Sequence, residues 1–142
     1  TSLAVAFDSN NGSLGLFGSL SCGSQSVDIE WVFSRSLLYS CTVPVPIRDT
    51  ETTTTVYEID IAQLFRQSTL DSGSDALLGE AIVNADKNTD GFTHLYELSD
   101  VLLSSLTGYD DFSEDRIQTL YQHIEKNNDR IISIDGKACN GY

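Results

Sequence analysis

Twelve residues near the middle of the chain carry oxygen-bearing side chains at alternate positions. They read Asp86-Lys87-Asn88-Thr89-Asp90-Gly91-Phe92-Thr93-His94-Leu95-Tyr96-Glu97. Oxygen donors at positions 1, 3 and 5, glycine at 6 and glutamate at 12 are typical of a loop that binds Ca²⁺, which takes about six to eight oxygen ligands. Gly91 allows the sharp turn, since a residue without a Cβ tolerates positive φ. The segment predicts a calcium loop.

The pattern also predicts which atoms bind the ion. The expected ligands are Asp86, Asn88, Asp90, the backbone carbonyl of Phe92, His94 and Glu97. His94 occupies position 9, where a ligand usually acts through water, and direct coordination is not expected because imidazole suits softer metals. Glu97 has the reach to donate both oxygens. Because only three of the ligands are charged, we expect an affinity from roughly micromolar to sub-millimolar.

The first 59 residues show the patterns of β-strands. Residues 27–33 alternate, with Val27, Ile29, Trp31 and Phe33 on one face and acids opposite, which predicts a half-buried strand with Trp31 in the core. Asn11-Gly12 favours a hairpin turn, although with Ser13 it is also a glycosylation acceptor. Further strands are expected over residues 3–7, 14–20, 37–43 and 52–57.

From residue 60 the apolar spacing changes to the period of a helix. Asp60 is a candidate N-cap for a first short helix, and further helices are expected over residues 75–85, 98–106 and 114–124. The expected fold class is therefore α+β. A small antiparallel, β-rich N-terminal region (residues 1–59) would precede a helical region (residues 60–142).

A second segment, residues 125–136, aligns with the calcium loop in the same register. It reads Glu125-Lys126-Asn127-Asn128-Asp129-Arg130-Ile131-Ile132-Ser133-Ile134-Asp135-Gly136. Apolar residues stand eight, five, four and one positions before each segment, which indicates an internal repeat. The chain from about residue 74 onward thus resembles the EF-hand superfamily. The resemblance implies an EF-hand pair, with Thr93 and Ile132 joined in a short antiparallel contact.

The second segment departs from the EF-hand pattern at the positions that matter most. Position 1 is Glu125, position 6 is Arg130 instead of glycine, and position 12 is Gly136, so the bidentate carboxylate is missing. Three potential ligands remain: Asn127, Asp129 and Ser133. We expect a structural partner that holds the geometry of the first loop. The alternative is a weak site completed by water or by Asp135.

The formal net charge of −13 limits the partners of the chain. Such acidity repels nucleic acid and anionic membranes, and no apolar run approaches the roughly twenty residues that span a bilayer. Neither nucleic-acid binding nor membrane insertion is expected, and no signal peptide is recognised. Acidity also simply keeps a protein soluble, but the calcium loop favours cation binding.

The three cysteines do not decide whether the protein is extracellular or intracellular. In an oxidising compartment the expected disulfide is Cys22–Cys41, with Cys139 free or linking two chains in a disulfide-bonded dimer. The alternative is three reduced cysteines in an intracellular protein.

No enzymatic signature is present. The only histidines, His94 and His123, belong to no nucleophile motif or zinc pattern, so catalysis is not expected. The chain also has no methionine, whereas calcium sensors commonly bind targets through Met-rich grooves. We expect a secreted structural or interaction protein, in which Ca²⁺ stabilises the fold and supports binding to a protein, a glycan or the extracellular matrix. The alternative is an intracellular, cytoplasmic sensor or buffer whose N-terminal half docks a target.

Overall fold

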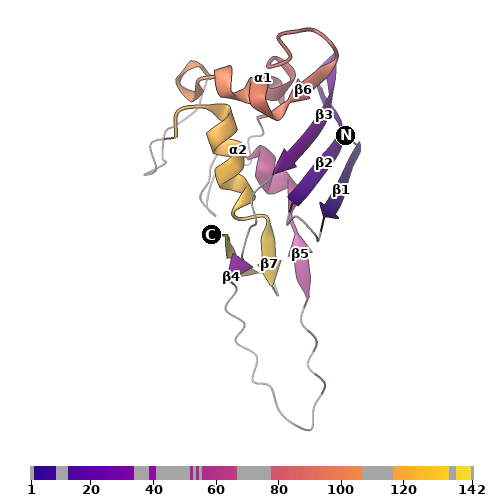
Figure 1. Cartoon of the computed structure of the whole chain (residues 1–142), viewed down its shortest axis with the longest axis vertical. Coiled ribbons are helices and arrows are strands. Elements are labelled where there is room, and N and C mark those ends of the chain that lie inside the picture. Colours follow the sequence, from indigo (N-terminus) through magenta and orange to yellow (C-terminus); the bar gives the residue numbers. More distant parts are fainter. Residues whose placement is uncertain are drawn as a thin grey trace.

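The computed structural model describes residues 2–8, 13–33, 39–40, 52, 54, 56–66, 78–106, 117–134 and 137–141, some by their backbone alone (Figure 1). The strands are β1 (Ser2–Asp8), β2 (Ser13–Cys22), β3 (Gln25–Phe33), β4 (Tyr39–Ser40), β5 (Tyr57–Ile59), β6 (Phe92–His94), β7 (Ile132–Ile134), β8 (Lys137–Ala138) and β9 (Asn140–Gly141). The α-helices are α1 (Gly79–Val83) and α2 (Leu120–Asn128), and the 3₁₀ helices are η1 (Ile61–Phe65), η2 (Leu95–Asp100) and η3 (Leu103–Ser105).

The largest sheet has the strand order β1-β2-β3-β6. The first three strands are antiparallel neighbours, whereas β6 lies parallel to β3 at the edge. The predicted strands at residues 3–7, 14–20 and 27–33 are confirmed, and the expected alternation in β3 appears as buried and exposed residues in turn. The predicted Asn11-Gly12 turn lies outside the described residues.

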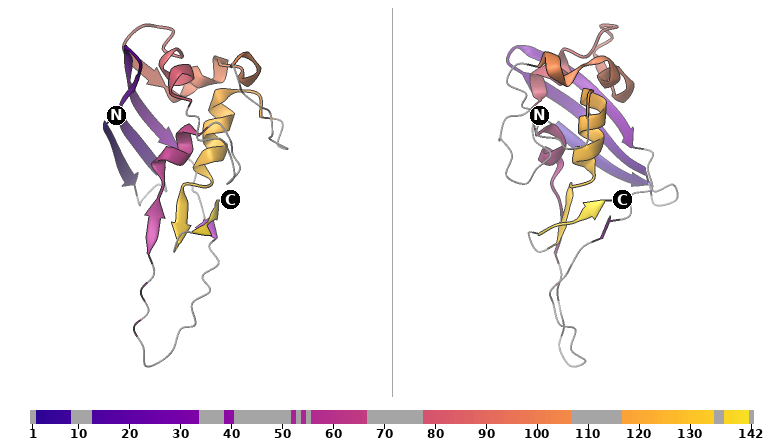
Figure 2. Two further views of the ribbon diagram at one scale, coloured as in Figure 1. Left: turned by 180° about the vertical axis from the view of Figure 1, so that it is seen from behind. Right: turned by 90° about the vertical axis from the view of Figure 1, so that its left-hand side faces the viewer.

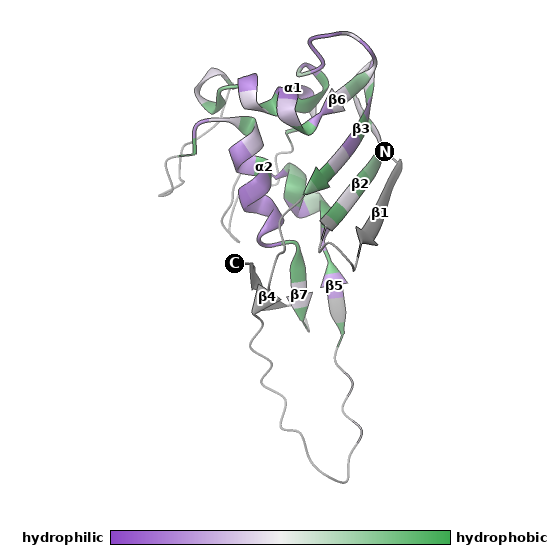
Figure 3. Ribbon diagram, viewed as in Figure 1, coloured by the Kyte–Doolittle hydropathy of each residue, from purple (hydrophilic) through white to green (hydrophobic). Residues whose placement is uncertain are grey.

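One face of this sheet carries the core. Figure 2 shows α1 and α2 on the same side of the sheet, where α1 contacts β2 and β3 and α2 packs against η1 and η2. Figure 3 shows green, apolar residues in β2 and β3 and a largely hydrophilic α2. Trp31 has no exposed surface, and its ring centroid lies 5.9 Å from Phe65 and 6.5 Å from Phe33. The predicted core position of Trp31 is confirmed. Residues from both halves of the chain form one hydrophobic cluster.

Two smaller sheets lie beyond the core. One has the order β5-β7-β8, and the other pairs β4 with β9. The strand expected over residues 52–57 begins only at Tyr57, because β5 is set by its antiparallel pairing with β7. Most of the strand expected over residues 37–43 lies outside the described residues. None of the described helices is long and apolar enough to span a membrane.

The predicted helical EF-hand pair is wrong, and the α+β expectation built on it fails with it. The described part of the chain is mostly strands, and its longest helix, α2, has nine residues. Thr93 pairs with Ile29 of β3, and Ile132 pairs with Ile59 of β5, so the two loop strands do not meet. Each loop strand instead pairs with a strand of the N-terminal region, which supplies partners for its backbone N–H and C=O groups.

The expected helix over residues 98–106 is also absent. Val101 and Leu102 have extended backbone angles and separate η2 from η3. The backbone N–H of Leu103 donates to the carbonyl of Gln118, and the N–H of Leu120 donates to the carbonyl of Val101. These contacts with a distant segment replace the hydrogen bonds that would continue a helix.

The helices expected over residues 75–85 and 114–124 are shorter or shifted. Within the described residues, α1 covers only Gly79–Val83. Thr119 caps α2, since its side chain accepts the N–H of Gln122 at 3.3 Å. The helix then continues through Asn128, so the first four residues of the predicted second loop are helical.

A buried polar cluster fixes α2 to η1. The ring nitrogen Nε2 of His123 lies 2.9 Å from the backbone carbonyl of Arg66, so it must donate a proton to that oxygen. Asn127 Nδ2 donates to the same carbonyl at 2.9 Å and to that of Leu64 at 3.3 Å. His123 is 1 % exposed, and this burial lowers its pKa below 6.5, opposed by the Arg66 hydrogen bond. The imidazole is therefore neutral in the folded protein at neutral pH.

The lowered pKa of His123 predicts an acid-sensitive fold. The unfolded chain takes up a proton near pH 6.5, before the folded chain does. The contribution of the neutral His123 to the free energy of unfolding should thus be fully present above about pH 6.5. It should decrease as the pH drops toward the pKa of the folded state. Urea denaturation at pH 7.5, 6.5 and 5.5 measures this slope. His123→Gln still donates to the Arg66 carbonyl but does not titrate, so its slope should be shallower; equal slopes would contradict the assignment.

Candidate functional site

The candidate calcium loop connects α1 to β6 and η2. Thr93, which has no exposed surface, donates its hydroxyl to the carbonyl of Ile82 at 2.9 Å and so ties the end of the loop to α1. The N–H of Asp28 donates to the carbonyl of Gly91 at 2.8 Å, which begins the ladder between β3 and β6. The loop is thereby held between a helix and a sheet.

The side chains at positions 1, 3 and 5 all turn toward the backbone of the loop. Asp86 Oδ2 accepts the N–H of Gly91 at 3.0 Å, and Asn88 Oδ1 accepts the N–H of Asp90 at 3.0 Å. Asp90 Oδ1 accepts the N–H of Phe92 at 2.8 Å. The positive φ expected at Gly91 is confirmed at 87°. The oxygen atoms of these three side chains therefore lie on the inner side of the loop, within hydrogen-bonding distance of its backbone.

Glu97, at position 12, is buried in the first turn of η2. Only 6 % of its surface is exposed, and Oε2 accepts the backbone N–H of His94 at 2.8 Å. This contact is half of a capping box that orients the start of η2. A buried carboxylate is expensive to leave without a positive partner, so a cation beside Glu97 would be favoured.

His94 lies on the outer side of the loop. Its Nε2 lies 3.7 Å from Asp90 Oδ2, and its ring stacks between those of Phe92 and Tyr96, at centroid distances of 6.1 and 5.4 Å. The interplanar angles are 13° and 11°. The His94 side chain is thus in contact with both neighbouring rings, and its role at the ion stays a prediction.

The residues of the loop fit a hard cation. In the part of the chain that the structure describes, no three side chains of His, Cys, Asp or Glu gather closely enough to hold a metal ion. The donors of the loop, however, include an amide and a backbone carbonyl beside carboxylates, the set that Ca²⁺ prefers. Asp86 Oδ1 is buried and accepts no hydrogen bond. A cation would supply the partner that this oxygen lacks.

The second segment uses its polar groups for packing. Asn127 is committed to the carbonyls of Leu64 and Arg66, and Glu125 Oε1 accepts the hydroxyl of Tyr121 at 2.6 Å. Ser133 donates to Glu58 at 3.4 Å. None of these contacts reaches residues 86–97, so the predicted role of holding the geometry of the first loop stays a prediction. Asp135 and Gly136 lie outside the described residues.

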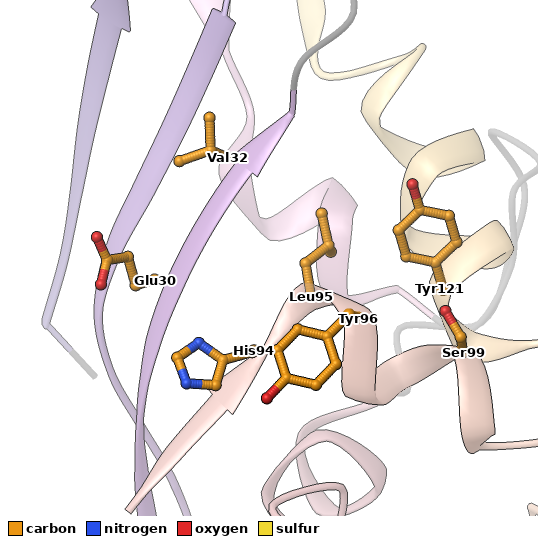
Figure 4. A pocket seen from close by; sticks show the side chains of 7 residues that line it. All are labelled: Glu30, Val32, His94, Leu95, Tyr96, Ser99 and Tyr121. Carbon is orange, nitrogen blue, oxygen red and sulfur yellow. The ribbon is translucent and has the colours of Figure 1, made fainter.

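Sequence reasoning missed a surface pocket beside the loop. Figure 4 shows Glu30 and Val32 of β3 across from His94, Leu95 and Tyr96, with Ser99 and Tyr121 at the far end. The cavity volume is about 570 Å³. Its residues come from β3, from the loop and η2, and from α2. The only signal in the sequence is the alternate spacing of three rings: Phe92, His94 and Tyr96.

The cysteines differ from the expected pairing. Cys22 carries a free thiol, so the predicted Cys22–Cys41 disulfide is not formed in this structure. Cys139 does not carry the free thiol that was one of the expectations: it is disulfide-bonded and buried, with 1 % of its surface exposed. Cys41 lies outside the described residues. Cys22 ends β2 and lies beside Gly79 of α1.

Comparison of the chain with protein-family models, curated proteins and solved structures finds no match. The function therefore has to be argued from the residues of the site.

Proposed function

We propose that residues 86–97 bind Ca²⁺ and that the ion stabilises a module for binding other molecules. The observation that carries the proposal is the buried oxygen of Asp86 that accepts no hydrogen bond, in a loop whose other donors are oxygens. The residues that would hold the ion are Asp86, Asn88, Asp90, the Phe92 carbonyl and Glu97, with His94 acting through water. Bound there, Ca²⁺ supplies the positive charge that the buried Glu97 carboxylate needs.

The site is built for a shape-stabilising role. The loop lies between α1 and the edge of the main sheet, and Trp31 Nε1 donates to the carbonyl of Thr93 at 2.8 Å from inside the core. An ion that tightens residues 86–97 would therefore hold β6 against β3. This role needs no catalytic step.

We also propose that the protein works outside the cell. Three charged ligands give weak calcium binding, and extracellular modules bind with dissociation constants of about 10⁻⁴ to 10⁻³ M. Such a site would be filled by extracellular calcium and largely empty in the cytoplasm. A dissociation constant below about 10⁻⁶ M would favour the intracellular sensor or buffer instead.

Calorimetric titration with Ca²⁺ tests the proposal directly. The wild-type protein should take up one ion, and Glu97→Gln should weaken binding by at least about tenfold, since it removes a charged and potentially bidentate ligand. Glu80→Gln, which neutralises an exposed acid on α1, is the matched control and should bind as the wild type does.

The outcome is decided by the difference between the two variants. If both variants lose calcium affinity equally, the ion binds to the acidic surface in general and the assignment to residues 86–97 is wrong. Circular dichroism of each variant without calcium shows whether it is folded. If Glu97→Gln is unfolded, Asp90→Asn serves as a second variant of a calcium ligand.

A further inference from the structure

The pocket beside the loop combines a carboxylate with exposed rings. Glu30 and His94 are partners in the parallel register of β3 and β6, so their side chains leave the same outer face of the sheet. The Tyr96 ring stacks on that of His94 at 11° and 5.4 Å, and 65 % of Tyr96 is exposed. A flat aromatic surface thus lies next to an acidic group (Figure 4).

The far end of the pocket is polar. Ser99 presents its hydroxyl group there, and the hydroxyl of Tyr121 donates to Glu125 Oε1 at 2.6 Å. That contact places a second carboxylate behind the tyrosine. The pocket therefore offers acceptors at both ends and aromatic carbon between them.

Glu30 has no positive partner among the described residues. The described residues that line the pocket include neither lysine nor arginine. Among the described residues, Glu30 forms no ion pair or side-chain hydrogen bond. The whole chain carries a net charge of −13, which attracts basic partners over a distance.

A carboxylate beside a flat aromatic surface favours arginine among the basic side chains. A guanidinium group is planar, stacks on the face of an aromatic ring and forms two parallel hydrogen bonds with a carboxylate. An ammonium group is a compact charge that uses the flat ring less well. A neutral sugar would use the ring but not the unpaired charge of Glu30.

We propose that this pocket binds an arginine side chain from a basic segment of a partner protein. Glu30 pairs with the guanidinium, and Tyr96 supplies the stacking surface. The proposal goes beyond calcium binding and does not depend on it, because Glu30 is placed by β3 and Tyr96 by η2.

Nuclear magnetic resonance titration tests whether the pocket binds arginine. EDTA is present throughout, so the result can be interpreted even if the loop does not bind calcium. The ¹⁵N-labelled protein is titrated with the blocked tripeptide Gly-Arg-Gly and with the same peptide carrying citrulline, which is neutral but nearly isosteric. The arginine peptide should shift the amide signals of Glu30, Tyr96 and Ser99 in a saturable way, and the citrulline peptide should bind at least about fivefold more weakly.

Variants separate recognition in the pocket from general attraction. Glu30→Gln and Tyr96→Ala should each weaken the arginine peptide by about fivefold, the effect of roughly 1 kcal/mol. Glu58→Gln removes one exposed acid from β5, away from the pocket, and should change binding by less than about twofold.

Three results would overturn the proposal. Equal binding of the arginine and citrulline peptides would exclude charge recognition. Shifts spread over the acidic surface, with Glu30→Gln and Glu58→Gln equally affected, would reduce the interaction to net charge. Pocket shifts caused by tri-N-acetylchitotriose, a neutral trisaccharide, and not by the arginine peptide would assign the aromatic surface to a glycan.

Discussion

Replacing Trp31 with alanine is expected to lower the free energy of unfolding by about 3–5 kcal/mol. The side chain is fully buried, and its ring packs against Phe33 and Phe65. Its Nε1 also donates to the carbonyl of Thr93 at 2.8 Å, so the substitution leaves a cavity and an unpaired carbonyl together. Urea denaturation followed by far-ultraviolet circular dichroism measures the loss, because Trp31 is the only tryptophan and fluorescence disappears with it.

Two further substitutions divide this effect into its parts. Trp31→Phe keeps most of the buried ring but removes the donor, so it should cost about 1–3 kcal/mol. Val32→Ala, on the same strand but with a 51 % exposed side chain, should stay within about 0.5 kcal/mol. If Trp31→Ala and Val32→Ala have the same effect, Trp31 does not anchor the core.

The alternation of β3 made its inner face predictable from the sequence. Successive side chains of a strand point to opposite faces, so the apolar set at Val27, Ile29, Trp31 and Phe33 had to lie on one side. The structure buries all four. The positive φ of Gly91 was also predictable from a local rule, because a residue without a Cβ adopts that backbone conformation without a steric penalty.

Strand partners were not predictable in the same way. The sequence of the loop shows that Thr93 and Ile132 suit a strand, but not which edge each one joins. Thr93 lies against Ile29 with no exposed surface, and Ile132 lies against Ile59. Apolar partners from the N-terminal region thus satisfy both strands, and the resemblance to a paired unit gave the wrong partner.

The missing helix after the loop has a similar cause. Leu98, Val101 and Leu102 follow a helical spacing, but the structure gives them different environments: Leu98 is fully buried, whereas Leu102 is 52 % exposed. Leu102 forms an isolated antiparallel bridge with Thr119. A pairing between residues so far apart in the sequence competes with the helix, and spacing alone contains no information about it.

The pocket could not be predicted for a related reason. Glu30 read as the solvated side of a strand, and Tyr96 as an unassigned residue of a metal loop. The parallel pairing of β3 with β6 brings the two together. Since that pairing was not foreseen, neither was the site.

Adding Ca²⁺ is expected to raise the free energy of unfolding by about 2.7 kcal/mol when its concentration is one hundred times the dissociation constant. The gain arises because the ion binds the folded loop and not the unfolded chain. Urea denaturation in EDTA and in excess Ca²⁺ measures it. Trp31 fluorescence gives a second signal in this case, because the indole donates to Thr93, a residue within the loop.

The two signals together show where the ion acts. Glu97→Gln should abolish most of the stabilisation and the fluorescence change, whereas Glu80→Gln should retain both. Stabilisation without a change at Trp31 would place the ion elsewhere on the acidic surface. A fluorescence change that Glu97→Gln retains would contradict the loop assignment. If both signals depend on Glu97, the ion stabilises the junction of β3 and β6, which is also where the arginine pocket is formed.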